Sequence, residues 1–183
     1  SLLDYARRNP GRLNYASGGN GSAGHLAGEL MKAMARVSAV HIPYAGAAPA
    51  QLGLLAGQTD FMFDNLASAA PQIRAGRLKG FAVTTLKPSS FFPELPTVSD
   101  TGLAGFDIST WFGIFAPAGT PKSVVDRLHA EFERALGSDD LRQRLSRMGA
   151  EPAPMTPADF GAFVLAEQKK YAGIVKASGA RVD

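Results

Sequence analysis

The residues best suited to chemistry lie in a glycine-rich loop, residues 17–22, after a short strand predicted at residues 13–16. This loop opens a predicted helix that begins at Ser22 or Ala23. Glycines permit sharp turns and let a ligand approach main-chain N–H groups closely. The first N–H groups of a helix lack intrahelical acceptors, and the helix dipole makes that end electropositive. These features predict an anion site, which we interpret as half of a binding site for a small carboxylate.

Three other interpretations of the loop are weaker. Gly19, Gly21 and Gly24 give the spacing G-x-G-x-x-G, which is typical of dinucleotide-binding folds. Those folds need an acidic residue about 20 positions later to hold the ribose hydroxyls. The next predicted strand, residues 39–43, and Tyr44 after it contain no acid, and Glu29 comes too early. A Walker-type phosphate loop fails because no lysine follows the glycines. The plain alternative is a tight strand-to-helix turn with no ligand.

Side chains near the loop give little support for catalysis. Ser22, His25 and Asp64 could be imagined as a hydrolytic triad, but no G-x-S-x-G elbow exists and Ser22 has the simpler role of helix N-cap. We therefore expect no enzyme and no catalytic residue. His25 is either a donor in the ligand wall or a residue packed on its own turn, whereas His41 is expected to be structural. With only His129 besides, and no paired carboxylates, we expect no metal and no cofactor.

Composition fits an ordinary globular protein. The 183 residues are 45% hydrophobic and 19% charged, with net charge +3 and no cysteine. The one basic stretch, Arg142, Arg144 and Arg147, fits a solvated helix face, so we expect no nucleic-acid binding. No apolar run reaches the roughly 18 residues of a membrane span, and no signal peptide is recognisable. The chain begins inside what reads as an amphipathic helix, so we expect a piece of a longer protein.

The elements that must position the loop alternate between strand and helix. This alternation predicts an α/β lobe with a mainly parallel sheet, in which ligands bind at the carboxyl ends of the strands. Three loops fall at such ends: residues 17–22, 44–47 and 64–65. The predicted strands are residues 13–16, 39–43, 59–63 and 78–85. Four helices are predicted with them: one that ends near residue 9, one at residues 23–35, one that ends at Gly57, and one that ends near residue 74.

The character of the sequence changes after residue 85. A long loop rich in proline and serine, residues 87–105, carries Phe91 and Phe92, which would mark a contact surface if exposed. A strand with Trp111 is predicted at 106–116. Three helices follow at about 121–136, 138–148 and 156–177, the first capped by Thr120 with Pro121 as its first residue, and the last with the same chemistry at Thr156. They are predicted to cover strands that lie elsewhere, before residue 1.

Several motifs follow in order along the chain. Besides residues 14–25, they are 41–46 (His-Ile-Pro-Tyr-Ala-Gly), 63–65 (Phe-Asp-Asn), 95–98 (Leu-Pro-Thr-Val), 102–106, 111–113 (Trp-Phe-Gly) and 116–121 (Ala-Pro-Ala-Gly-Thr-Pro). In this order and spacing they resemble the tripartite tricarboxylate receptor family, the Bug or TctC-type periplasmic solute-binding proteins. The resemblance spans nearly the whole chain.

This resemblance implies a two-lobed, type II periplasmic-binding-protein fold that closes like a hinge on a small organic carboxylate. The ligand would be a di- or tricarboxylate, an acidic amino acid or a related acid, delivered in the periplasm to the membrane subunits of a transporter. Residues 1–108 would form the second, ligand-binding lobe, and residues 109–183 the crossing strand and C-terminal helices of an incomplete first lobe. The implied ligand-binding residues are Ser17, Gly18, Gly19, Asn20, Gly21, Ser22, His25, Tyr44, Gly46, Ala47, Asp64 and Asn65.

One departure from the family leaves a second hypothesis open. Family members begin with a further segment, which faces the ligand from the other lobe and is lacking here. The alternative is therefore a truncated receptor that acts only as an interaction or sensor protein, or as a homodimer formed through the incomplete lobe.

Overall fold

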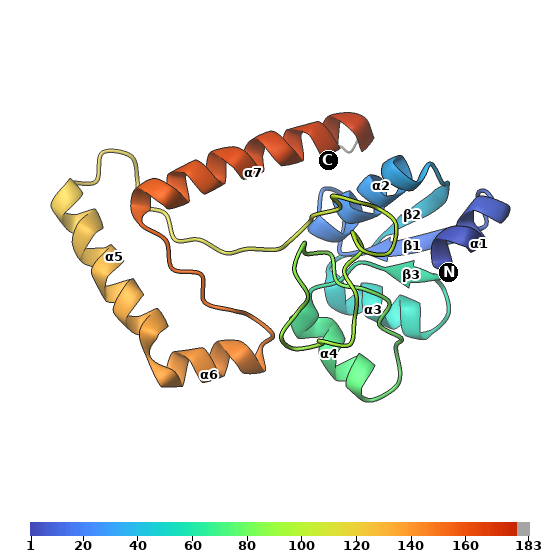
Figure 1. Cartoon of the computed structure of the whole chain (residues 1–183), viewed down its shortest axis with the longest axis horizontal. Helices are drawn as coiled ribbons and strands as arrows, with labels where there is room; N and C mark the ends of the chain where they lie inside the picture. Colours follow the sequence, from blue (N-terminus) through green and yellow to red (C-terminus); the bar gives the residue numbers. More distant parts are fainter. Residues whose placement is uncertain (179–183) are drawn as a thin grey trace. The chain divides into compact units, whose positions relative to one another are not determined.

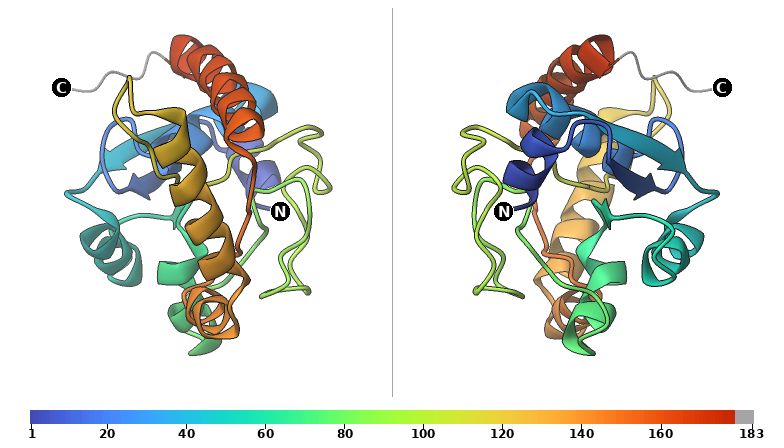
Figure 2. Two further views of the ribbon diagram at one scale, coloured as in Figure 1. Left: turned by 90° about the vertical axis from the view of Figure 1, so that its left-hand side faces the viewer. Right: turned by 90° about the vertical axis from the view of Figure 1, so that its right-hand side faces the viewer.

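The computed structural model describes residues 1–178. The chain divides into two compact units, whose elements are drawn in Figures 1 and 2. One unit contains residues 1–110 together with residues 171–178, and the other contains residues 111–170. Within the described residues, none of the helices combines the length and apolar character that a membrane crossing requires.

The first unit is built on a parallel sheet. Its strands are β1 (Leu13–Ser17), β2 (Ala39–Pro43) and β3 (Phe61–Met62), in the order β2-β1-β3. Both neighbours of β1 run parallel to it, with Tyr15 opposite His41 on one side and opposite Phe61 on the other. The expected parallel α/β sheet is therefore confirmed, and the central strand is the one that leads into the glycine loop.

Four helices accompany the sheet: α1 (Leu2–Arg8), α2 (Ala23–Ala35), α3 (Ala47–Leu55) and α4 (Leu66–Arg74). Because the chain steps from β1 to β2 and then back across β1 to β3, right-handed crossovers place α2 and α3 on opposite faces of the sheet (Figures 1 and 2). At the start of α1, the Ser1 hydroxyl accepts from the Asp4 N–H.

The core of this unit lies between α2 and the sheet. Tyr15 and Phe106 are fully buried, and Leu26 and Met31 of α2 pack into the same cluster. The Tyr15 ring lies so close to the α2 backbone that a Cβ at Gly28 would overlap it. Ile174 of α7 (Pro157–Ser178) also joins this cluster.

Three predicted strands are shorter or missing. Strand β3 has two residues where five were predicted, and just before it Asp60 bonds to Asn14 through side-chain as well as backbone groups. Residues 78–85 form only one isolated bridge, Val83 to Thr97, since the partner segment contains Pro96, which cannot donate to a ladder. Residues 106–116 form no strand, because the described chain offers no ladder partner for them beyond a single bond from Ile108 to Thr84.

The second unit is helical. Helices α5 (Lys122–Gly137) and α6 (Asp139–Arg147) meet at Ser138, which ends one and caps the other. Trp111 donates from Nε1 to Glu167 of α7 at 3.1 Å and packs edge-on against Phe160 and Phe163. Among the described residues no strand alternates with these helices, and residues 111–116, which were predicted as part of a strand, are irregular.

The two predicted helix starts differ in outcome. Thr156 accepts from the Asp159 N–H and precedes Pro157, which confirms its capping role. The N-cap of α5 is Pro121 instead of Thr120. Pro121 has a ψ angle of 137°, which is not helical, so the helix begins at Lys122. The Thr120 hydroxyl bonds back to the Pro117 carbonyl.

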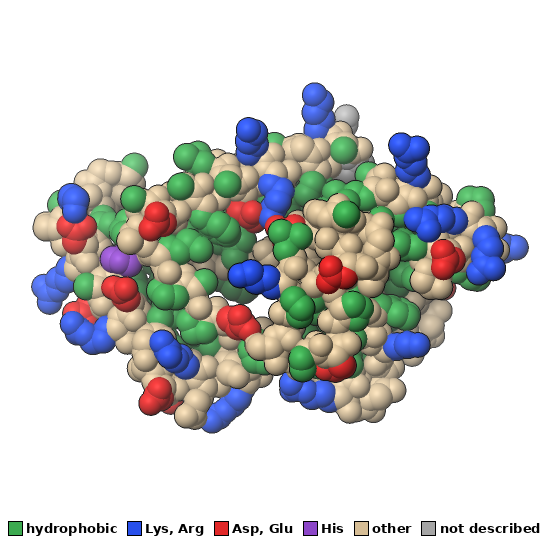
Figure 3. Space-filling view, viewed as in Figure 1, with side chains coloured by type: hydrophobic (Ala, Val, Ile, Leu, Met, Phe, Trp, Pro, Cys, Tyr) green, Lys and Arg blue, Asp and Glu red, His purple; other side chains and the backbone are tan. Residues whose placement is uncertain are grey.

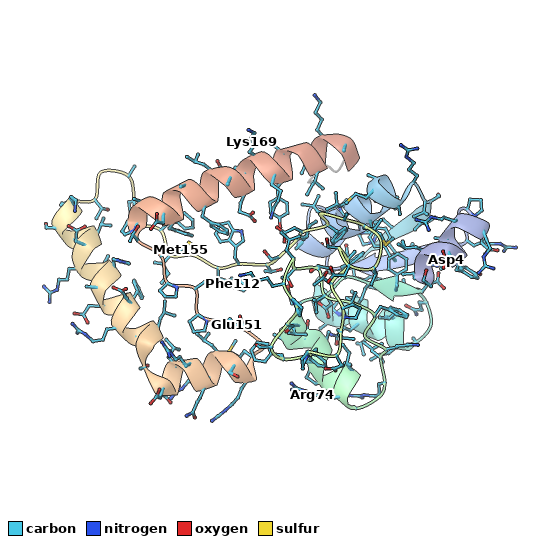
Figure 4. The ribbon with its side chains drawn as sticks, viewed as in Figure 1. Asp4, Arg74, Phe112, Glu151, Met155 and Lys169 are labelled. Carbon is cyan, nitrogen blue, oxygen red and sulfur yellow. The ribbon has the colours of Figure 1, made fainter. Side chains whose placement is uncertain are left out.

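Apolar side chains of the second unit lie at its surface (Figure 3). Phe112, labelled in Figure 4, is 91% exposed, and Val124, Leu128 and Phe132 repeat at four-residue spacing along α5 without a buried residue in that helix. In the first unit, Phe92 would have marked a contact surface if exposed, but its side chain is not exposed. It is buried beneath the guanidinium of Arg74, also labelled in Figure 4, at 5.2 Å from its ring centre.

The Gly28→Ala substitution tests the close packing of α2 on β1. We expect the added methyl group to force the Tyr15 ring or the helix aside and to lower the free energy of unfolding by about 1–3 kcal/mol. Gly173→Ala is the matched control in α7, where a Cβ meets nothing within 4 Å, and it should raise stability by up to about 1 kcal/mol. Urea unfolding measures both, and equal effects of the two substitutions would contradict this packing.

Candidate functional site

Three strand-to-helix junctions meet at the carboxyl edge of the sheet. They follow β1, β2 and β3, which are neighbours in the sheet. The β1 and β2 junctions are joined by backbone bonds: Tyr44 N–H donates to the Ser17 carbonyl at 3.0 Å, and Gly46 N–H donates to the Gly18 carbonyl at 3.2 Å. The convergence predicted from topology is present for this pair.

The third junction is held against the first two. A Cβ at Gly24 would lie 2.5 Å from the Phe63 carbonyl oxygen, so only glycine allows α2 to start so close to the end of β3. Gln51 of α3 donates from Nε2 to the Asp64 carboxylate at 2.7 Å. Backbone packing and one side-chain bond therefore bring all three junctions together.

Several helix-start N–H groups remain without a protein acceptor. In the part of the chain that the structure describes, they belong to Ala23 and Gly24 of α2, Ala47 and Ala48 of α3, and Leu66 and Ala67 of α4. Unsatisfied donors at helix starts carry the positive end of the helix dipole. This edge of the sheet can thus offer directed hydrogen bonds to an anion without a charged side chain.

The glycine loop has a defined shape. Gly19 and Gly21 have φ angles of +127° and +74°, which L side chains rarely adopt. The Ser17 hydroxyl lies 3.1 Å from both the N–H and the carbonyl of Gly19, and the Gly21 N–H donates to His25 Nδ1 at 3.0 Å. The loop is therefore fixed by bonds to its own flanking residues.

The other predicted ligand-binding side chains have partners within the protein. The Tyr44 ring packs on the backbone at Gly53, and its hydroxyl lies 3.3 Å from Gln58 Oε1. Asn65 Oδ1 accepts from the Thr110 hydroxyl at 2.7 Å. Asn20 is exposed and Ser17 is buried. The assignment of these residues to a ligand stays a prediction.

Asp64 does not cap α4. The N-cap position is Asn65, and Asp64 accepts the Asn65 N–H at 2.8 Å while its second oxygen faces Gln51. The helix starts at Leu66, directly after Asn65, so Asp64 lies one residue before the cap. Ser22, in contrast, is confirmed as the N-cap of α2, since its hydroxyl accepts from the His25 N–H at 3.3 Å.

The imagined triad is not assembled. The Ser22 hydroxyl contacts the backbone of His25, whereas the His25 ring contacts Gly21 and stacks on His41. Asp64 is engaged with Gln51. Within residues 1–178 no group of three histidine or acidic side chains is arranged to hold a metal ion.

Two side-chain contacts at the junctions were not predicted from the sequence. Gln51 ties the second junction to the third, and only its place in α3 could have drawn attention to it. His41, expected to be merely structural, lies with Nε2 2.6 Å from the Ser17 hydroxyl. The paired register of Tyr15 and His41 on adjacent strands is the pattern that places this side chain beside the loop.

His25 and His41 lie in an environment that favours their neutral forms. Burial, with a smaller contribution from His25, lowers the pKa of His41 to about 4. Burial also lowers the pKa of His25, which is 7% exposed. For Glu29, burial alone would raise the pKa, but bonds from Lys32 and Tyr15, both at 2.7 Å, lower it overall.

Comparison with known proteins identifies the relatives of this chain. The family described as the tripartite tricarboxylate transporter family receptor matches residues 1–180. A protein from the tcbD-tcbE intergenic region of Pseudomonas sp. (strain P51) is 39% identical, over 95% of this chain and 52% of the relative. The chain thus spans about half the length of that curated relative.

Solved structures share this fold. An R. palustris protein determined with adipate is 36% identical, with a TM-score of 0.88 over 98% of this chain and 60% of that one. The periplasmic binding protein BugD is 35% identical, with a TM-score of 0.84 over 98% of this chain and 61% of its own. The predicted fold, a periplasmic-binding-protein-like lobe with a parallel sheet, is confirmed.

The His41→Gln substitution tests the buried neutral histidine. The pKa of a histidine in an unfolded chain is about 6.5. Between that pH and about pH 4, the unfolded chain therefore binds more protons at His41 than the folded chain does. The free energy of unfolding therefore falls as pH is lowered through this window. Glutamine still reaches Ser17 but does not titrate. When the pH is lowered through this window, the free energy of unfolding of His41→Gln should therefore fall less than that of wild type.

Urea unfolding at about pH 7 and about pH 4.5 measures that difference. An unchanged pH dependence in His41→Gln would contradict a neutral His41 in the folded protein.

Proposed function

This chain belongs to the tripartite tricarboxylate transporter receptor family, and we propose that its three converging junctions bind a small organic dicarboxylate. The observation that carries the proposal is the set of acceptor-free N–H groups at the starts of α2 and α3, on junctions joined by direct backbone bonds. Helix-start amides suit carboxylates because they donate directed hydrogen bonds from the positive end of the dipole. They also avoid the desolvation of a charged side chain.

The ligand of a solved relative supports a dicarboxylate as the ligand class. The relative solved with adipate binds an acid with a carboxylate at each end. The glycine loop, the Tyr44–Ala47 turn and the Asp64–Asn65 turn would hold one carboxylate in this unit. The second carboxylate would face the lobe supplied by the remaining part of the receptor, by analogy with relatives that are longer than this chain.

We extend the proposal to the biological setting and to the domain division. The chain would act in the periplasm, as BugD does, and would deliver its ligand to the membrane subunits of a tripartite transporter. Residues 1–108 would be the ligand lobe, and 109–183 the crossing segment and helices of the other lobe. The exposed apolar positions along α5 are compatible with a helix layer that packs on further structure.

The Gly21→Val substitution tests the ligand site. Gly21 has a φ of +74°, so valine would push the loop out of its present shape. We expect adipate affinity, measured by calorimetric titration, to fall at least about tenfold. Gly11→Val is the matched control, because Gly11 has the same φ of +74° but lies in the turn before β1 with nothing within 4 Å of its Cβ.

The titration series would include succinate and citrate beside adipate. Equal affinity in both valine variants would contradict a ligand on the glycine loop. No heat with any of these acids, together with a stable dimer in light scattering, would favour the alternative of an interaction protein without a ligand.

A further inference from the structure

Two histidines stack beneath the glycine loop. The rings of His25, from α2, and His41, from β2, are parallel within 5° and have centres 3.9 Å apart. Tyr15 of β1 stacks on His41 in turn, with ring centres 4.9 Å apart. Three elements of the first unit thus contribute to one stack, and the two imidazoles in it touch the loop directly.

Each imidazole contacts a different part of the loop. His25 Nδ1 accepts the Gly21 N–H at 3.0 Å. His41 Nε2 lies 2.6 Å from the Ser17 hydroxyl, which is bonded to Gly19. The histidine pair therefore supports the loop just before α2, whose first N–H groups lack acceptors.

The two contacts respond differently to a proton. A ring nitrogen accepts a hydrogen bond only while it carries no proton, so Nδ1 of His25 must be unprotonated to hold Gly21. A proton there would set two N–H donors against each other. The contact of His41 tolerates either state, because a serine hydroxyl both donates and accepts. Loop geometry therefore depends on the protonation of His25 specifically.

The titratable and charged side chains that face His25 and His41 come from α2 and from the two neighbouring strands. Glu29 and Lys32, one and two turns along α2, lie beside His25, with Glu29 Oε1 3.9 Å from His25 Nε2. Tyr15 of β1 donates to the same Glu29 oxygen, and His41 faces His25 from β2. At 3.9 Å the carboxylate is beyond hydrogen-bond range of Nε2, and it is already bonded to Tyr15 and Lys32.

We propose that His25 is a positioning residue, whose unprotonated Nδ1 fixes Gly21 and so aims the α2 N–H groups at the ligand, and that ligand affinity weakens when His25 is protonated. The proposal rests on the dicarboxylate-binding function above. Burial supports it by lowering the pKa of His25, so the binding form persists through neutral pH and is lost under acid conditions.

The decisive variants are His25→Asn and His25→Phe. Asparagine can place its Oδ1 near the position of Nδ1 but does not titrate, whereas phenylalanine keeps a flat ring without an acceptor. Adipate affinity is measured by calorimetry from about pH 7.5 to about pH 4.5. Ligand ionisation is identical for every protein at a given pH, so affinity ratios between variant and wild type isolate the contribution of the protein.

When the pH is lowered from about 7.5 to about 4.5, we expect the ratio of wild-type affinity to His25→Asn affinity to fall at least about fivefold. At about pH 7.5, His25→Phe should bind more weakly than His25→Asn. His129→Gln is the control and should follow wild type throughout. A constant affinity ratio between wild type and His25→Asn would overturn the proposal.

A second measurement needs no ligand. In the free protein, the amide resonance of Gly21 should shift with the titration of the His25 ring in wild type and stay constant in His25→Asn. A Gly21 amide resonance that does not shift while the His25 ring titrates would overturn the positioning role. Failure of wild type to bind any dicarboxylate at any pH would instead overturn the proposed function, and the Gly21 resonance would still decide the role of His25.

Discussion

The close approach of the glycine loop to its two neighbouring junctions is the constraint on which the candidate site depends. Gly46 N–H bonds to the Gly18 carbonyl on one side. On the other side, the start of α2 at Gly24 lies against the Phe63 carbonyl, where any Cβ would collide. Backbones in such contact bring the helix-start donors together, and one side-chain bond, from Gln51 to Asp64, adds to that packing.

That constraint also assigns roles to the side chains around the loop. Ser17, His25 and Asp64 have hydrogen-bond partners in the protein, and each of them fixes backbone or a neighbouring junction. The polar side chains thus shape the loop, and the main chain supplies the donors. Such a division suits a receptor, because rigid amides bind an anion without a nucleophile or a general base.

Prediction from sequence succeeded where local patterns decide the structure. Helix α2 begins and ends at the predicted residues, 23 and 35, because Ser22 caps it and its apolar residues recur at helical spacing. It failed for residues 78–85 and 106–116, since a strand needs a hydrogen-bonded partner that no local pattern reveals. Gln51 and the stack of His25 on His41 were missed for the same reason, because both join residues distant in sequence.

The most direct test of the account is an amide NMR titration of the chain with adipate. If helix-start donors bind the ligand, the largest shifts will fall on the N–H groups of Ala23, Gly24, Ala47 and Ala48, which have no acceptor in the free protein. Saturable shifts confined to other surfaces, with these four amides unmoved, would contradict the central claim that main-chain donors at the converging junctions form the site.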